Sequence, residues 1–141
     1  MVNSNLKQIA LLAALTTFTI GAEADKNTDP NLRISNLNGE IFGASVGDMK
    51  ITFKDSVPHS MRVDIYKALK ETRNDYNVTN LSIEMVPAPQ GTYRLGYGEL
   101  GYTLYFAAVV RTKEEITDII RKALSPGLEA VRKVDKLNKW Y

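Results

Sequence analysis

Six residues in the second half of the chain, Gly96-Tyr97-Gly98-Glu99-Leu100-Gly101, have the spacing G-x-G-x-x-G found in dinucleotide-binding enzymes. In those enzymes the glycines open a helix, whose free N–H groups receive the pyrophosphate. Here the next residues, Tyr102–Val110, are strand-forming, so the context argues against such a site. Protein kinases do place a glycine-rich loop between two strands, but this chain lacks their H-R-D and D-F-G motifs. The spacing favours a hairpin or bulge with glycines at positive φ; a nucleotide-binding loop is the alternative.

Side chains that commonly catalyse reactions or hold metals are few. His59 is the only histidine and there is no cysteine, so zinc sites, thiolate chemistry and Ser-His-Asp triads lack the groups they need. Glu84 and Glu99 would form an acid–base pair only if they faced each other across a sheet, and scattered exposed glutamates are the simpler interpretation. The sequence therefore predicts a protein that is not an enzyme and that needs no cofactor or metal.

Tyrosines crowd one segment, and basic residues gather towards the C-terminus. Tyrosine is enriched at protein–protein contacts, although it is also a good strand residue. Basic side chains near helix ends are also favoured by the helix dipole, so a solvated helix face is the alternative for them. Paired with acidic residues of a neighbouring copy, they would complete a contact. The predicted interface comprises Tyr93, Tyr97, Tyr102, Tyr105, Arg132, Lys133 and Lys136.

The stretch Ile9–Ala24 has two interpretations that place the protein in different compartments. A lysine, an apolar core and a small-x-small end are typical of a cleaved secretory signal peptide covering residues 1–24. The same residues also fit a first helix followed by a strand. The apolar run is shorter than the roughly 20 residues that span a bilayer, so we expect no integral membrane span.

Length and composition are those of a single globular domain. The chain has 141 residues, of which 44% are hydrophobic and 24% charged, enough for one hydrophobic core. The net charge is +2, which gives no reason to expect specific nucleic-acid binding. The absence of cysteine fits a reducing compartment. We therefore expect residues 1–141 to form one domain.

Alternating apolar residues predict several strands. The pair Asn38-Gly39 is typical of a type I′ turn and predicts a hairpin. A nearly continuous apolar run near residue 106 predicts a central strand that is covered on both faces. The expected strands are Leu32–Leu37, Glu40–Ala44, Met49–Phe53, Leu81–Met85, Thr92–Leu95 and Tyr102–Val110.

Helical spacing predicts the remaining elements. Ser56 and Pro58 suit the start of a helix whose apolar face runs over Met61–Leu69 and which ends near Asn74. A capping box, Thr112-Lys113-Glu114-Glu115, precedes a second helix, and a Ser-Pro-Gly break precedes a third. Together these elements predict an α+β fold: a mostly antiparallel sheet of four to six strands with helices packed on one face, plus C-terminal helices.

The order of these elements resembles that of the tail terminator (tail completion) proteins of long-tailed bacteriophages. The similar stretches are Met49–Phe53, running through Val57-Pro58 into the helix at Met61–Leu69, and the hairpin from Thr92–Leu95 to Leu104–Ala107. They cover about half of the chain. The resemblance implies a ring-forming, non-enzymatic subunit in which a sheet edge builds the contact between copies.

Three functions of different kinds follow as hypotheses, of which the third is a small enzyme or nucleotide binder that uses the loop Gly96–Gly101. The first is a structural or assembly protein that acts by self-association, as a tail or neck subunit of a phage particle, located in the virion or the host cytoplasm. Its partners would be further copies of itself, with a ring as one arrangement, and neighbouring assembly proteins. The alternative is a small secreted or periplasmic binding domain from which residues 1–24 have been cleaved.

Overall fold

The computed structural model describes residues 29–109, 111–133 and 137–141. The chain divides into two units, Met1–Leu32 and Arg33–Tyr141. In the described part of the first unit, the Asp29 carboxylate accepts a hydrogen bond from the backbone N–H of Asn31 at 2.9 Å. Both interpretations of Ile9–Ala24 lie outside the described residues.

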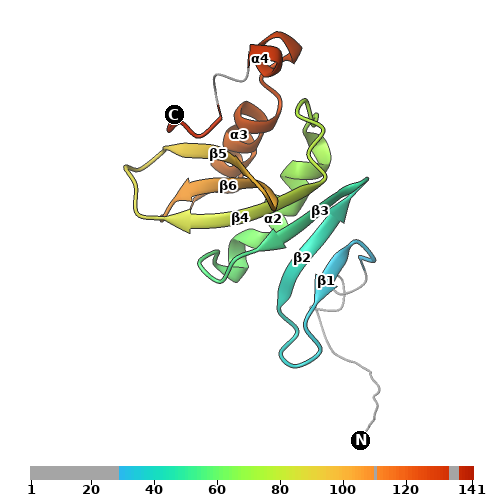
Figure 1. Cartoon of the computed structure of the whole chain (residues 1–141). Coiled ribbons are helices and arrows are strands. Elements are labelled where there is room, and N and C mark those ends of the chain that lie inside the picture. The colour runs from blue at the N-terminus through green and yellow to red at the C-terminus, as the bar shows by residue number, and fades with distance from the viewer. Residues whose placement is uncertain (1–28, 110, 134–136) are drawn as a thin grey trace, which may run out of the picture. The chain divides into compact units, whose positions relative to one another are not determined.

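Six strands form one sheet, and the described helices are three (Figure 1). The order across the sheet is β1-β2-β3-β4-β6-β5. The β2–β3 and β5–β6 pairs are antiparallel, whereas β3–β4 and β4–β6 are parallel. The elements are β1 (Leu32–Ile34), β2 (Ile41–Val46), β3 (Met49–Phe53), α2 (His59–Glu71), β4 (Asn80–Val86), β5 (Tyr93–Gly98), β6 (Gly101–Ala107), α3 (Lys113–Leu124) and α4 (Leu128–Lys133).

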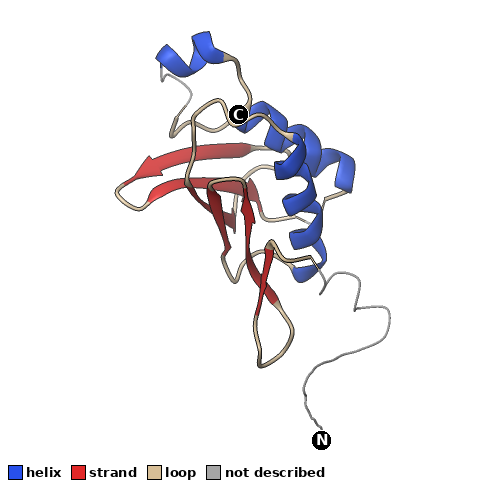
Figure 2. Ribbon diagram, turned by 90° about the vertical axis from the view of Figure 1, so that its right-hand side faces the viewer, coloured by secondary structure: helices blue, strands red, loops and turns tan. Residues whose placement is uncertain are grey.

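The predicted α+β fold is confirmed, as a mixed sheet with parallel pairs at its centre. Figure 2 shows α2 and α3 against one face of the sheet, while the opposite face carries no helix of the described part. The alternation of apolar residues sets this arrangement, because side chains two apart share a face of a strand. Fully buried side chains on the helix-covered face include Ile51, Leu81, Ile83, Leu104 and Phe106.

β6 is internal, as predicted, but helices cover only one of its faces. Leu104 and Phe106 are buried, whereas Thr103 and Tyr105 on the other face are half-buried. The strand also ends earlier than predicted, at Ala107. The sequence of β6 lacks the usual alternation because the face that does not meet the helices carries Thr103 and the Tyr105 ring in place of charged side chains.

The first hairpin exists, but its turn differs from the predicted type. A type I′ turn needs positive φ at both central residues. Gly39 has a φ of +69°, whereas the φ of Asn38 is not positive. The Asn38 side chain instead accepts a hydrogen bond from the Glu40 N–H at 3.0 Å, and the backbone of Ser35 pairs with both Gly39 and Glu40. A longer loop therefore joins β1 to β2.

The start of α2 also corrects the prediction. Pro58 occupies the N-cap position and no side chain caps the helix. The Ser56 hydroxyl, predicted as the cap, accepts a hydrogen bond from the Met85 N–H at 2.9 Å instead. The helix ends at Glu71, earlier than predicted, because Asn74 forms a closed loop with the backbone of Val78, with both hydrogen bonds at 2.8 Å.

Arg62 on α2 is 4% exposed and ties three segments together. Its guanidinium donates to the carbonyls of Val57 at 2.8 Å, Ile41 at 2.7 Å and Lys54 at 3.2 Å. Burial lowers the pKa of this guanidinium, and an arginine keeps its charge despite such a shift. Its hydrogen bonds satisfy carbonyls that the end of β3 and the start of β2 leave free.

The helix α3 begins as the sequence predicts. The Thr112 hydroxyl accepts from the Glu115 N–H at 3.2 Å, and the Glu115 carboxylate accepts from the Thr112 N–H at 2.9 Å, which is a complete capping box. Ile116, Ile119 and Ile120 are buried. The third predicted helix, α4, is present, but of its six described residues none is buried.

Candidate functional site

The glycine-rich segment Gly96–Gly101 spans the β5–β6 hairpin and does not open a helix. Gly98 pairs with Gly101, so the connecting turn contains only Glu99 and Leu100. Of the three motif glycines, Gly101 alone has positive φ, at +112, and an added Cβ would lie 2.8 Å from the Asn80 carbonyl oxygen. The hairpin interpretation is confirmed, and a helix end facing a pyrophosphate is not formed here.

The other side chains that could take part in catalysis or metal binding do not lie together either. Glu84 pairs with Tyr105 in the middle of the sheet, whereas Glu99 lies in the hairpin turn, so the two glutamates do not face each other. The Nε2 atom of His59 lies 3.0 Å from a carboxylate oxygen of Glu40, and both side chains are exposed. Among the described residues, no group of three histidines, aspartates or glutamates could hold a metal ion. None of the described helices is sufficiently long and apolar to cross a bilayer.

Three of the four predicted interface tyrosines lie on the helix-covered face of the β5–β6 hairpin. Tyr97 and Tyr102 are opposite each other in register, with ring centroids 4.7 Å apart. Tyr76 extends the group, 5.9 Å from the Tyr102 ring. Burial raises the pKa of Tyr102 and Tyr93, so these hydroxyls are neutral over the physiological pH range.

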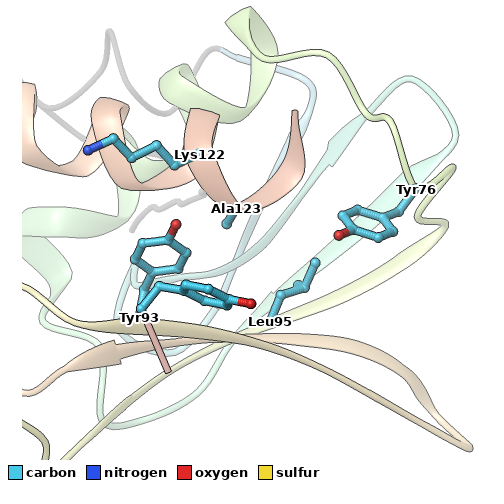
Figure 3. Close-up of a pocket in the computed structure, with 6 residues that line it drawn as sticks. Tyr76, Tyr93, Leu95, Lys122 and Ala123 are labelled. Carbon is cyan, nitrogen blue, oxygen red and sulfur yellow. The ribbon is translucent and has the colours of Figure 1, made fainter. Parts of the chain in front are cut away.

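A small hollow lies between this hairpin and α3 (Figure 3). Tyr93 and Leu95 rise from β5 towards Ala123 on the helix above (Figure 3). The free volume is about 10 Å³, which is close to that of one water-sized sphere. Lys122 at its rim is already paired with Asp118 at 2.9 Å. The hollow is therefore a gap between packed rings and does not have the size of a ligand site.

The chain's C-terminal end lies along the outer edge of β5. Tyr93 and Tyr141 exchange two backbone hydrogen bonds, at 3.0 Å and 2.9 Å, and Arg94 and Trp140 form the next antiparallel bridge. We call Asn138–Tyr141 the C-terminal segment. A sheet edge that builds the contact between copies would have to be unpaired, and we expected this of the hairpin of tyrosines; that expectation is wrong, because the β5 edge is paired within the chain. Four residues far along the chain occupy it in the manner of a short seventh strand.

Asn138 anchors the start of the C-terminal segment. Its N–H donates to the Leu95 carbonyl at 2.8 Å, and its side-chain oxygen accepts from the Tyr97 N–H at 3.3 Å. Asn138 has φ +64, a conformation that asparagine tolerates better than most residues. An added Cβ at Gly96 would lie 3.2 Å from the same side-chain oxygen. The absence of a side chain at Gly96 therefore leaves room for the segment.

Arg94 lies between two aromatic rings on the face opposite the helices. Its guanidinium carbon is 4.3 Å from the Tyr105 ring centroid and 5.5 Å from the Trp140 ring centroid. The buried Nε of Arg94 has no hydrogen-bond partner in the described part of the chain. The rings are therefore its main partners, and each such cation–π contact contributes roughly 0.5–2 kcal/mol.

Sequence reasoning found the tyrosines of the hairpin but missed the aromatic residues that join them. The signal was present: Trp140 is the only tryptophan and ends a polar stretch together with Tyr141. We call the combined set the aromatic edge. It consists of Tyr93, Tyr97, Tyr102, Tyr105, Trp140 and Tyr141.

The predicted basic residues lie outside this group. Arg132 and Lys133 are exposed at the last turn of α4, where cations are favoured by the helix dipole. Lys136 is outside the described residues. The acidic pair that could meet these basic residues on a neighbouring copy is Glu114-Glu115. Glu115 is engaged in the α3 capping box, while Glu114 is exposed.

Comparison of the chain with known protein families, curated protein sequences and solved structures gives no match.

Proposed function

We propose that this chain is a structural or assembly protein that acts by self-association, as a tail or neck subunit of a bacteriophage particle. The observation that carries the self-association is the exposure of large apolar side chains around the β5 edge. Tyr97 is 60% exposed, Leu100 95%, Trp140 42% and Tyr141 46%. These side chains lie on both faces of the sheet beside this edge, and exposed apolar groups of this size favour an interaction site, because covering them removes apolar surface from water.

The composition of the aromatic edge suits a protein contact better than a catalytic site. Tyrosine and tryptophan bury large rings at a small entropic cost and keep a polar group at the rim. Arg94 is already positioned between two rings, so little side-chain freedom remains to be lost on binding. Arg132 and Lys133 would act as rim charges that affect the association rate more than the affinity.

The assignment to a phage particle rests on the order of the elements. The strand β3, the helix α2 and the β5–β6 hairpin occur in the order that resembles tail terminator proteins. The sheet has six strands and carries helices on one face. A ring of copies joined at a sheet edge is the assembly that this resemblance implies.

The test is the mass of the full chain in solution by light scattering over a range of concentrations. Wild type should form a defined oligomer, and Tyr97→Ala/Tyr102→Ala should shift it towards monomer by at least tenfold in dissociation constant. The matched control is Leu37→Ala/Phe42→Ala, which also removes exposed apolar side chains, 96% and 45% exposed, but outside the aromatic edge. A monomeric wild type at high concentration would contradict self-association. An oligomer unaffected by the tyrosine variant would place the contact elsewhere.

The alternative function is a secreted or periplasmic binding domain. The feature that favours it is the signal-like pattern of residues 1–24. Intact mass and N-terminal sequencing of the protein from its native source decide between the two: a start at Asp25 supports secretion, and a retained Met1 or Val2 supports the assembly protein.

A further inference from the structure

We infer that copies of this chain are joined by exchange of the C-terminal segment, so that Asn138–Tyr141 of one copy pairs with β5 of the next. This inference rests on the proposed self-association and names the contact that produces it. The partner is a second copy of this chain, and the surface that receives it is the outer edge of β5.

The β5 edge is shaped to receive this particular segment. It supplies the backbone bonds to Tyr141 and Asn138, and Arg94 supplies the cation that the Trp140 ring covers. Gly96 leaves the space that the Asn138 side chain fills. A strand edge by itself accepts many extended peptides. The Trp140 and Asn138 contacts favour the chain's own C-terminal segment at this edge.

The connection between the body of the subunit and the segment does not fix which copy the segment pairs with. Among the described residues before the segment, the last one held by a distant side chain is Gly127, whose N–H donates to the Asp75 carboxylate at 2.8 Å. Then follows α4, of whose described residues none is buried and whose first residue, Leu128, is 62% exposed. Ten residues, 128–137, separate the two anchors. Six of them form α4, so with this helix intact the connection can span at most about 20 Å.

Exchange costs little because the same contacts form in both arrangements. The two hydrogen bonds between Tyr93 and Tyr141 and the Arg94–Trp140 stack are identical whether they join one chain or two. The two arrangements differ only in the path of the linker and in the translational entropy that is lost when two copies associate. This entropy loss becomes smaller as the local concentration of copies rises. A different partner would first have to displace the segment and then replace its contacts. A second copy of the chain carries an identical segment, which can displace the first one and form the same contacts.

Engineered disulfides can detect the exchange, because the chain contains no cysteine. In an antiparallel pair that exchanges both hydrogen bonds, the Cα atoms are about 5.5 Å apart, within the usual range for a disulfide. In the double variant Tyr93→Cys/Tyr141→Cys, exchange predicts a ladder of covalent multimers on a non-reducing gel. Pairing within one chain predicts a monomer with an internal disulfide.

A mixture of single variants isolates the contact between copies. Tyr93→Cys and Tyr141→Cys, made with tags of different length, are unfolded together, refolded and oxidised. We expect a covalent heterodimer at several times the yield of the control mixture Tyr93→Cys with Leu37→Cys, because Leu37 is exposed in the β1–β2 loop. Circular dichroism of the reduced variants checks their folding. The adjacent pair Arg94→Cys/Trp140→Cys repeats the test if the first pair does not fold.

Each result separates this inference from the proposed function. Covalent multimers together with the heterodimer support exchange. An internal disulfide in a protein that light scattering shows to be oligomeric overturns exchange and leaves self-association standing. An internal disulfide in a protein that stays monomeric at high concentration overturns both. Failure of both cysteine pairs to form any disulfide in folded protein would contradict the pairing of the segment with β5.

Discussion

The Asp75 carboxylate accepts a hydrogen bond from the backbone N–H of Gly127 at 2.8 Å, although the two residues are 52 positions apart in the chain. Arg73 forms an ion pair with the same carboxylate at 3.1 Å, and the Asp75 side chain is only 8% exposed. The backbone N–H of Asp75 also donates to the Leu124 carbonyl at 3.0 Å. The loop that follows α2 therefore holds the end of α3 and the start of the linker to α4.

Asp75 should make folding stability depend on pH. The Arg73 guanidinium and the Gly127 N–H hold the pKa of Asp75 below its usual range. Because the folded pKa is the lower one, the stabilisation is complete above the unfolded pKa of about 3.9 and is lost as the pH falls through the folded pKa. Urea denaturation should show Asp75→Asn to be less stable than wild type at pH 7, by about 1–2 kcal/mol.

The difference between Asp75→Asn and wild type should shrink below about pH 4. The control Glu99→Gln, an exposed turn residue, should unfold like wild type at pH 7. If the difference in unfolding free energy between Asp75→Asn and wild type stays constant down to pH 2, the proposed dependence of stability on the Asp75 carboxylate is contradicted.

Gly101 and Gly98 should respond very differently to the same substitution. An added Cβ at Gly101, where φ is +112, would lie 2.8 Å from the Asn80 carbonyl oxygen, whereas at Gly98 it meets nothing within 4 Å. Gly101→Ala therefore combines backbone strain with a clash, and we expect it to cost at least about 2 kcal/mol in unfolding free energy. Gly98→Ala should change stability by less than about 1 kcal/mol. Equal melting temperatures for the two variants would show that the hairpin turn is wrongly described.

Replacement of Arg62 should destabilise the fold even when the charge is kept. Arg62→Lys cannot reach the carbonyls of Val57, Ile41 and Lys54 together, and a buried carbonyl without a donor costs about 1–3 kcal/mol. We expect a loss of about 2–4 kcal/mol in chemical denaturation. Arg121→Lys, whose side chain is 58% exposed, is the control and should stay within about 0.5 kcal/mol of wild type. Similar stabilities for both variants would mean that Arg62 is not a buried link.

Phe106→Asp should abolish folding. Phe106 is fully buried on the helix-covered face of β6, and an unpaired carboxylate there costs several kcal/mol. Soluble expression and circular dichroism measure the effect. Leu100→Asp puts the same side chain at a position that is 95% exposed, and it should fold normally. If Phe106→Asp melts like wild type, β6 is not internal.

Local patterns predicted the strands and helices because each pattern has a local cause. The alternation of Met49, Ile51 and Phe53 reflects one wet and one dry face, and the Thr112–Glu115 capping box is complete within four residues. Turn types were less predictable. Asn38-Gly39 has the residues of a type I′ turn, but the Asn38 side chain bonds to Glu40 and favours another conformation.

Pairing between distant segments could not be predicted from local patterns. Nothing in the sequence near Tyr93 indicates that Tyr141 is its neighbour, since backbone hydrogen bonds carry no side-chain signature. The tyrosines were identified as a group because they are close in sequence, whereas Trp140 and Arg94 were missed because only the fold brings them together. The same holds for Ser56, whose partner Met85 is 29 residues away.

The strand β6 follows β5 directly in the sequence, yet it lies between β4 and β5 in the sheet. The β5–β6 hairpin closes through a short turn, and hairpins of this kind form within about 1–10 μs. Pairing with β4 joins residues 21 positions apart, such as Leu81 and Tyr102, and must first overcome the entropy of loop closure. We therefore expect the hairpin to form early and to dock onto β4 as a unit, in a step slower than the formation of the hairpin itself.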